Sequence, residues 1–265
     1  SAAKEYMKVY GVLVGKKPLI FTNNDSGYET AIEFKKNGVN PLILDTRKEP
    51  SSDIISEAKN LGIEIKFSYV VVAAKGYKKV KSADIAKISD NKKDLSNIEN
   101  IECDCICVSG FWTPSIHLAS QSGNKSEFNE KIDAFIPKKS KQNENTIGSA
   151  NGKFTLEETI NEAFDKGYEV SNKITENNNK VSMPTVVEKK STEHDKFWCV
   201  PLPKGKSYKR FLDFQNDVAV TDIELALREG FRSIEHVKRY TTLGMATDQG
   251  KTSNLNGLQL VSDIE

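Results

Sequence analysis

The feature that most constrains the fold is a strand–helix–strand pattern near the N-terminus. An apolar run over residues 18–22 has the length and composition of a buried strand. Helical spacing follows over 26–36 and ends at Asn37-Gly38, after which a second apolar run occupies 41–45. Alternation of this kind predicts a parallel sheet whose neighbouring strands are joined by a right-handed crossover.

The turn after the first strand lies where dinucleotide-binding proteins place their phosphate loop. Such loops carry G-x-G-x-x-G, which lets the backbone approach a pyrophosphate at the helix N-terminus. Of these glycines the turn retains Gly27 alone. The carboxylate of Asp25 would repel phosphate, whereas the side chains of Asn23, Asn24 and Ser26 can donate hydrogen bonds. The turn is either a degraded nucleotide site or a structural turn that has lost its ligand, and the missing glycines favour the second interpretation.

Further strands and helices follow through the first half of the chain. Asp45 ends the second apolar run, where dinucleotide-binding folds carry an acid that binds the ribose. The other predicted elements are a helix over 1–10 with Tyr6, Met7 and Tyr10 on one side, a helix from Ser51 or Ser52 through Leu61, a strand that begins at 63–65, an antiparallel pair at 69–74 and 76–80, one strand over 101–109, and a hairpin over 126–141.

Three of the four cysteines alternate within the strand expected over 101–109. Cys103 and Cys107 would lie about 13 Å apart on one strand. Zinc bonds of ~2.3 Å cannot span that separation, so we expect half-buried strand residues and no metal site. Four cysteines spaced in this way also do not form a disulfide framework.

A second glycine-rich loop, TIGSANGKFTLEE at 146–158, precedes a predicted helix. Helix N-termini favour anions, and Gly148, Ala150 and Gly152 would let a ligand approach the backbone closely. The alternative is a loop that only caps the helix.

Residues 210–254 predict a short strand, two helices joined by a tight turn, and an irregular loop. Thr221 and Glu224 have the spacing of a capping box, and Gly230 stands where a C-terminal glycine belongs. Ser233 is expected to cap the second helix. The inner face of that helix is predicted to consist of Ile234, Val237 and Tyr240. A DNA-binding helix–turn–helix is the alternative, but the segment holds about as many acids as bases.

This stretch resembles the small [2Fe-2S] module of the bacterioferritin-associated-ferredoxin type. That module holds its cluster with C-x-C before the helices and C-x4-C after them. The four cysteine positions correspond to Asp213, Gln215, Asp248 and Ser253. Because such clusters are held by thiolates, the resemblance implies a relative without an iron–sulfur cluster and without a metal.

With its segments DFQNDV and KRYTTLGMATDQGKTSN, the stretch is similar to the alpha subunits of heterotetrameric sarcosine oxidases, and nearly the whole chain can be laid on the middle of such a subunit. The implied fold is α/β: an incomplete two-dinucleotide-binding (Rossmann-like, FAD/NAD(P)-binding) domain with a mixed sheet, followed by a small, mainly helical ferredoxin-like domain. The implied division is 1–170, made of an NAD subdomain at about 15–110 and a closing segment at 140–170, a linker at 171–195, and the cluster-free domain at 196–265. The linker range is also rich in Asn, Lys and Glu, as exposed linkers are.

The resemblance implies a subunit of an oxidoreductase that demethylates sarcosine to glycine and forms H2O2 and methylenetetrahydrofolate. The beta subunit of such complexes carries FAD and covalent FMN, so no catalytic residue is expected in this chain. The chain would wall a partial NAD pocket and pack against beta, with gamma and delta as further partners. The residues expected at the NAD pocket are Gly148, Ser149, Ala150, Gly152, Phe154, Thr155, Asn23, Asn24, Asp25, Ser26 and Asp45.

Near the C-terminus, a loop that offers hydrogen-bond donors, cations and glycine would suit a flavin phosphate or a charged face of the beta subunit. The residues expected there are Lys238, Arg239, Thr241, Thr242, Gln249, Gly250 and Lys251. A solvated helix end is the alternative for this set. For the chain as a whole, three alternatives compete with the interpretation as a sarcosine oxidase subunit: an independent pyridine-nucleotide reductase, a subunit of a related amine, proline or opine dehydrogenase, and a non-catalytic assembly module.

Composition excludes several other classes of function. The chain has 38 basic and 37 acidic residues, which argues against a nucleic-acid partner. No apolar run approaches the roughly 18–20 residues of a membrane span, and the start lacks an apolar signal segment. We therefore expect a cytoplasmic protein that does not enter the membrane.

Overall fold

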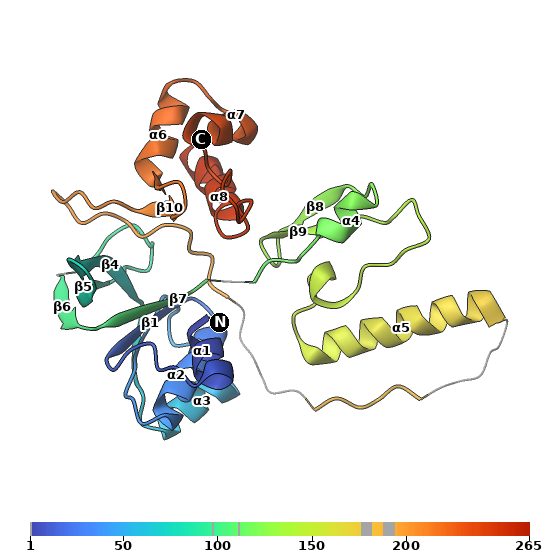
Figure 1. The fold of residues 1–265 in the computed structure, drawn as a ribbon, viewed down its shortest axis with the longest axis horizontal. Helices are drawn as coiled ribbons and strands as arrows, with labels where there is room; N and C mark the ends of the chain where they lie inside the picture. The colour runs from blue at the N-terminus through green and yellow to red at the C-terminus, as the bar shows by residue number, and fades with distance from the viewer. Residues whose placement is uncertain (1, 97, 111, 176–181, 188–193) are drawn as a thin grey trace. The chain divides into compact units, whose positions relative to one another are not determined.

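The computed structural model describes residues 2–96, 98–110, 112–175, 182–187 and 194–265 (Figure 1). The chain divides into two compact units. The first unit comprises Ser1–Gly110 together with Ser191–Glu265, and the second comprises Phe111–Lys190. In the part of the chain that is described, no helix has the length and apolarity needed to cross a bilayer.

A four-stranded parallel sheet forms the centre of the first 110 residues, with the strand order β3-β2-β1-β7. The predicted parallel sheet and crossover are thereby confirmed, and β1 and α2 have the predicted bounds. The strands are β1 (Pro18–Thr22), β2 (Leu42–Asp45), β3 (Glu64–Phe67) and β7 (Cys105–Ser109).

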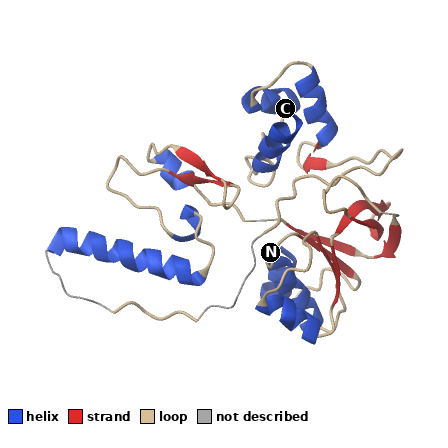
Figure 2. Ribbon diagram, turned by 180° about the vertical axis from the view of Figure 1, so that it is seen from behind, coloured by secondary structure: helices blue, strands red, loops and turns tan. Residues whose placement is uncertain are grey.

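Three helices, seen on one side of this sheet in Figures 1 and 2, bury their apolar faces against it. They are α1 (Ala2–Tyr10), α2 (Ser26–Lys36) and α3 (Asp53–Asn60). Side chains alternate along a strand, so Ile20 of β1 faces this helical core while Leu19 faces a second core on the other side. The expected apolar side of α1 is only partly correct, because Met7 is buried but Tyr6 and Tyr10 are exposed.

The second core lies between the parallel sheet and a separate antiparallel sheet. The antiparallel sheet consists of β4 (Tyr69–Gly76), β5 (Val80–Lys87) and β6 (Glu99–Glu102). Parallel and antiparallel strands thus occupy two sheets and not one mixed sheet. The second strand of the predicted pair also lies later than expected, at 80–87, because residues 77–79 form the turn of the hairpin.

The single strand expected over 101–109 is two strands, β6 and β7, in different sheets. The break falls at Asp104, whose carboxylate accepts the backbone N–H groups of Lys16 and Lys17, both at 2.8 Å. Cys103 is consequently buried in the second core, while Cys107 packs at the helical core.

The C-terminal part of the first unit is a hairpin followed by three helices around their own core. The elements are β10 (Phe211–Asp213), β11 (Val218–Ala219), α6 (Val220–Arg228), α7 (Ile234–Thr241) and α8 (Asn254–Ile264). Sequence reasoning predicted two of these helices and no element for α8. Gly230, at φ 94°, follows the C-cap of α6 as predicted. Ser233 lies at the predicted N-cap position of α7, but its side chain makes no capping hydrogen bond.

The predicted capping box does not form, since the N-cap lies two residues earlier at an alanine, whose side chain has no acceptor. The N-cap is Ala219 and not Thr221, because β11 runs directly into the helix. Asp222 accepts the backbone N–H of Ala219 at 2.8 Å, and Glu224 instead pairs with Arg210 at 3.3 Å. Tyr240 is 46% exposed and stacks on Phe231, so it is not on the inner face of α7.

The second unit contains the predicted hairpin and a long helix. Its elements are α4 (His117–Gln121), β8 (Ser126–Asn129), β9 (Ala134–Pro137), a 3-10 turn η1 (Gly148–Asn151) and α5 (Leu156–Thr175).

Candidate functional site

The turn between β1 and α2 retains the close packing of a phosphate loop. Counted back from Gly27, the spacing G-x-G-x-x-G places Thr22 and Asn24 at the other two glycine positions. A Cβ atom added to Gly27 would lie 2.6 Å from the Cβ of Thr22, so a side chain has no room there. Gly27 therefore performs the helix–strand packing that the last glycine of the fingerprint performs.

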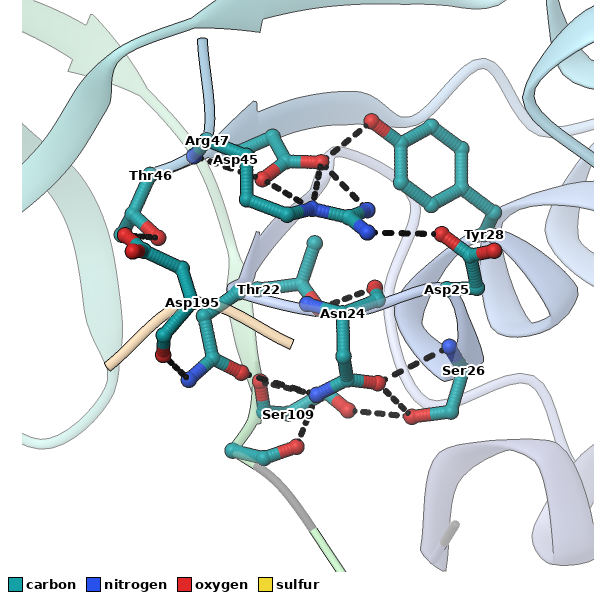
Figure 3. A network of polar contacts seen from close by, with 12 residues as sticks. Thr22, Asn24, Asp25, Ser26, Tyr28, Asp45, Thr46, Arg47, Ser109 and Asp195 are labelled. Carbon is teal, nitrogen blue, oxygen red and sulfur yellow. Dashed lines mark hydrogen bonds and ion pairs between the residues drawn. The ribbon is translucent and has the colours of Figure 1, made fainter. Parts of the chain in front are cut away.

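The Asn24 side chain fills the turn from within (Figure 3). Its Oδ1 accepts the backbone N–H of Ser26 at 2.9 Å and the hydroxyl of the same residue at 2.5 Å. Its Nδ2 donates to Asn23 Oδ1 at 2.8 Å and to the carbonyl of Gly110. The first N–H of α2, which a phosphate would use, is thus taken by the chain itself.

Asp45 lies beside this turn at the end of β2, and its side chain is fully buried. The Tyr28 hydroxyl donates to its Oδ2 at 2.6 Å, and the Arg47 guanidinium donates to both oxygens at 2.8–3.2 Å. A further guanidinium nitrogen reaches Asp25 Oδ1 at 2.8 Å. One arginine thus holds two carboxylates, and Asp45 is directed to these partners and away from solvent.

This arrangement shifts the pKa values of two side chains in the network. Burial, reinforced by the neighbouring Asp45, raises the pKa of Tyr28 far above its usual range. Burial alone would lower the pKa of Arg47, but its hydrogen bonds and charge interaction with Asp45 outweigh that effect and raise it. The tyrosine remains a neutral donor and the arginine a cation throughout the physiological range.

Asp195 reaches the same edge of the sheet from a distant part of the sequence (Figure 3). Its backbone N–H donates to Asn23 O at 2.9 Å, and Asn23 Nδ2 donates to its carbonyl at 2.8 Å. Its carboxylate accepts the hydroxyl of Thr46 at 3.0 Å and the ammonium group of Lys92. The structure therefore brings together Asn23, Asn24, Asp25, Ser26 and Asp45 and joins them to Arg47, Tyr28 and Asp195, which sequence reasoning missed.

The second set of residues predicted at the NAD pocket, Gly148 to Thr155, belongs to the second unit. The carboxylate of Glu162 accepts hydrogen bonds from this loop. Glu162 accepts the backbone N–H of Gly148 and the side-chain amide of Asn151, both at 2.7 Å. Thr155 Oγ1 accepts the N–H of Glu158 at 3.2 Å, as a helix cap does. Ser149 and Phe154 are exposed, whereas Gly148 is buried.

The ferredoxin-like positions also lie near one another. Asp213, 3% exposed, accepts three backbone N–H groups: Gln215 at 2.8 Å, Asn216 at 3.2 Å and Gly244 at 2.8 Å. Burial alone would raise the pKa of Asp213, but these three donors outweigh it and hold the pKa below its ordinary value. A charged carboxylate thus binds the amides around the first cysteine position.

Two of the other three positions also accept hydrogen bonds from the surrounding chain. Gln215 Oε1 accepts the Thr247 hydroxyl at 2.9 Å, and Asp248 accepts the N–H of Gly250 at 3.1 Å and the Thr252 hydroxyl at 3.1 Å. Ser253 is fully buried, and its hydroxyl has no hydrogen-bond partner among the described residues. The acceptor oxygens of Asp213, Gln215 and Asp248 thus face hydrogen-bond donors. Over the described ranges, no group of three or more His, Cys, Asp or Glu residues is placed to hold a metal ion.

The residues predicted at a flavin or subunit interface differ in accessibility. Arg239, Thr242, Gln249 and Lys251 are exposed and Lys238 and Thr241 are half-buried, whereas Gly250 is buried. Sequence reasoning missed Phe214, which is 81% exposed between the first two cysteine positions.

Residues 207–265 match the family model described as the sarcosine oxidase A3 domain. Sarcosine oxidase subunit alpha of Rhizobium meliloti (strain 1021) is 33% identical over 267 residues, which cover 98% of this chain and 25% of that protein. The chain is similar to sarcosine oxidase subunit alpha over nearly its whole length.

The same protein from Corynebacterium sp. (strain P-1) is 26% identical over 269 residues, covering 99% of this chain and 28% of the relative. The chain spans about a quarter of the length of the sarcosine oxidase alpha subunits that it matches. The resemblance inferred from DFQNDV and the loop after α7 is thereby confirmed. Among solved structures, the thioredoxin reductase of T. acidophilum aligns at a TM-score of 0.38 and 16% identity over 52% of this chain and 48% of that chain. The flavoprotein disulfide reductase RclA from Escherichia coli aligns at a TM-score of 0.44 and 14% identity over 62% and 36%.

Proposed function

We propose that the chain acts as part of the alpha subunit of a heterotetrameric sarcosine oxidase. The complex would demethylate sarcosine to glycine and form H2O2 and methylenetetrahydrofolate. The observation that carries this proposal is the 33% identity to such a subunit across 98% of the chain. Its partners would be the beta, gamma and delta subunits of a cytoplasmic complex.

Within that complex the chain would supply structure and not a catalytic group. Asp45, Arg47 and Asp213 are each held by several internal partners. A proton-transfer residue needs a pKa near the working pH and access to the substrate. The buried Asp45 and Asp213 lack that access. The amine oxidation would therefore take place on flavin carried by the beta subunit.

A nucleotide would contact the loop from Gly148 to Thr155 and not the turn at Asn24. Exposed Ser149 and Phe154 offer a hydroxyl and an aromatic ring for an NAD molecule, and Gly152 has the positive φ of 77° that permits a close turn. The turn at Asn24 has its own side chain where a diphosphate would bind. Asn23, Asn24, Asp25, Ser26 and Asp45 would hold the edge of the sheet without contacting the diphosphate.

The loop after α7 would face the flavin-bearing beta subunit, with FMN at the interface. Gln249 and Lys251 of this loop and Arg239 in the last turn of α7 are exposed and offer positive charge and hydrogen-bond donors. Such groups suit a flavin phosphate or an acidic face of a partner.

The test uses the intact complex. Lys251→Ala should reduce the FMN retained per complex or the fraction of assembled complex, while Lys36→Ala, an exposed lysine on α2, should change neither. Unchanged FMN content and assembly in Lys251→Ala would remove the interface proposal. Oxygen consumption with proline or an opine but not with sarcosine would contradict the assignment of the complex itself.

A further inference from the structure

Two cysteines of β7, Cys105 and Cys107, form a thiol pair that the proposed function does not use. Their Sγ atoms lie 3.7 Å apart, and both residues are half-buried and free of disulfides. Alternate residues of a strand point to the same face of a sheet, so both thiols lie on one face of β7. Cys103 lies in the second core, whereas Cys107 packs at the helical core.

The backbone that carries the pair is held in place by its neighbours. Cys105 pairs with Pro18 of β1, and Cys107 pairs with Ile20 of the same strand. β7 is the last strand in the order β3-β2-β1-β7, so within this sheet only one of its edges is covered by a neighbouring strand. A Cβ atom added to Gly15 would lie 2.6 Å from the Cβ of Cys105, so the chain passes beside this cysteine at a residue without a side chain.

This fixed backbone is poorly suited to a disulfide between the two cysteines. Alternate residues of a strand are about 6.6 Å apart, and their Cβ atoms point in the same direction. A disulfide requires its Cβ atoms to lie roughly 3.5–4.5 Å apart, so β7 would have to leave its register with β1.

An ion placed between the sulfurs does not require such a movement. Two bonds of about 2.3 Å, the length of a zinc–thiolate bond, meet at an angle of about 107° when the sulfurs are 3.7 Å apart. One ion can therefore bind both sulfurs at their present separation.

We propose that Cys105 and Cys107 together bind the soft monovalent cation Cu(I) as a two-thiolate chelate. Thiolates are the ligands that select soft cations, and Cu(I) accepts two or three ligands, so the pair needs at most one small external ligand. Binding forms two copper–sulfur bonds, releases the two thiol protons and leaves the oxidation state of copper and sulfur unchanged. The proposal does not depend on the assignment of the chain to a sarcosine oxidase alpha subunit.

The experiment titrates the full, reduced chain with Cu(I) in the absence of oxygen, with ascorbate to keep the copper monovalent. Bicinchoninate, whose Cu(I) complex is coloured, competes for the ion and reports its transfer to the protein. We expect one tightly bound Cu(I) per chain. The second thiolate acts at a high effective concentration, so Cys105→Ser and Cys107→Ser should each bind at least about a hundredfold more weakly.

Cys199→Ser is the matched control, because Cys199 is also half-buried but lies outside β7. Its affinity should stay within about threefold of that of the unaltered chain. Full affinity in a folded Cys105→Ser or Cys107→Ser chain, or an equal loss in Cys199→Ser, would overturn the proposal.

Zinc is the second probe. Protein-bound zinc takes four ligands in most sites and the pair offers two, so Zn(II) should bind at least about a hundredfold more weakly than Cu(I). Equal or tighter binding of zinc would contradict the choice of ion.

A last measurement needs no variant and therefore does not depend on the folding of one. One equivalent of Cu(I) should protect Cys105 of the unaltered chain from iodoacetamide, as seen by peptide mapping, and should leave the alkylation of Cys199 unchanged. Alkylation of Cys105 at the same rate with and without bound copper would overturn the proposal.

Discussion

The Oδ2 atom of Asp213 accepts a hydrogen bond of 2.8 Å from the backbone N–H of Gly244, 31 residues later in the chain. The bond ties the β10–β11 hairpin to the loop after α7, at the position that corresponds to the first cysteine of a [2Fe-2S] module. The other oxygen of Asp213 binds the amides of Gln215 and Asn216. A carboxylate thus joins two segments that a cluster joins in the cysteine-bearing module.

Replacing Asp213 with asparagine should destabilise the C-terminal part by about 2 kcal/mol, because the amide N–H2 would face a backbone donor in a buried place. Urea unfolding followed by circular dichroism measures the change. Asp217→Asn is the matched control, since Asp217 is exposed and asparagine tolerates its φ of 53°. Equal stability of the two variants would show that the carboxylate does not hold the loop.

The contribution of Asp213 should also depend on pH. Its pKa in the folded chain lies below the ordinary value of 3.8 because the backbone donors outweigh burial. A depressed pKa stabilises the fold above the unfolded pKa, and this stabilisation is lost as the pH falls through the folded pKa. The difference in unfolding free energy between the unaltered chain and Asp213→Asn should therefore be constant above about pH 5 and should shrink below it. A difference that grows on acidification would contradict this assignment.

Gly27→Ala should destabilise the first unit by about 1–3 kcal/mol, because the added carbon would lie 2.6 Å from Thr22. Gly167→Ala should have the opposite effect on stability. Gly167 lies within α5 and an added carbon would meet no atom within 4 Å, so alanine should stabilise that helix by about 0.5–1 kcal/mol. Thermal unfolding midpoints compare the two, and a neutral Gly27→Ala would mean that the turn does not require close packing.

Cys105 should be the fastest of the four cysteines to react with iodoacetamide. Its Sγ lies 3.7 Å from that of Cys107, and a hydrogen bond from the Cys107 thiol lowers the pKa of Cys105 to about 7. Burial raises the pKa of Cys103 and of Cys199, which should react slowly. Peptide mapping after timed alkylation should give a midpoint near pH 7 for Cys105. Cys107→Ala should move that midpoint toward 9.0, and an unmoved midpoint would exclude the thiol pair as its cause.

Elements set by local pattern could be predicted from the sequence, and those set by distant contacts could not. β1 and α2 follow from an apolar run, a turn and helical spacing, and their bounds are as predicted. The break between β6 and β7 depends on Asp104 binding Lys16 and Lys17, 88 and 87 residues away. Helix α8 was missed because Gly257 lowers its helix propensity. The glycine serves packing instead, since a Cβ atom at this position would lie 2.3 Å from the Leu243 side chain.

For the candidate sites, too, the residues could be identified from the sequence but their binding partners could not. The spacing around Gly27 identified the turn, and the cysteine frame identified Asp213, Gln215, Asp248 and Ser253. What these residues bind became visible only in three dimensions. Arg47 stands two residues after Asp45, an adjacency that could have suggested the buried ion pair. No local pattern connects Asp195 with Thr46, because the segment that carries it is 149 residues distant.

We propose that oxygen-bearing side chains hold the loop after α7 together without iron. Iron and acid-labile sulfide measured in the purified chain, after expression with supplementary iron and cysteine, test it most directly. A cluster-bearing ferredoxin prepared in parallel confirms that clusters survive the procedure. We expect neither element above background in the chain. Iron and sulfide in equal and stoichiometric amounts would contradict the claim.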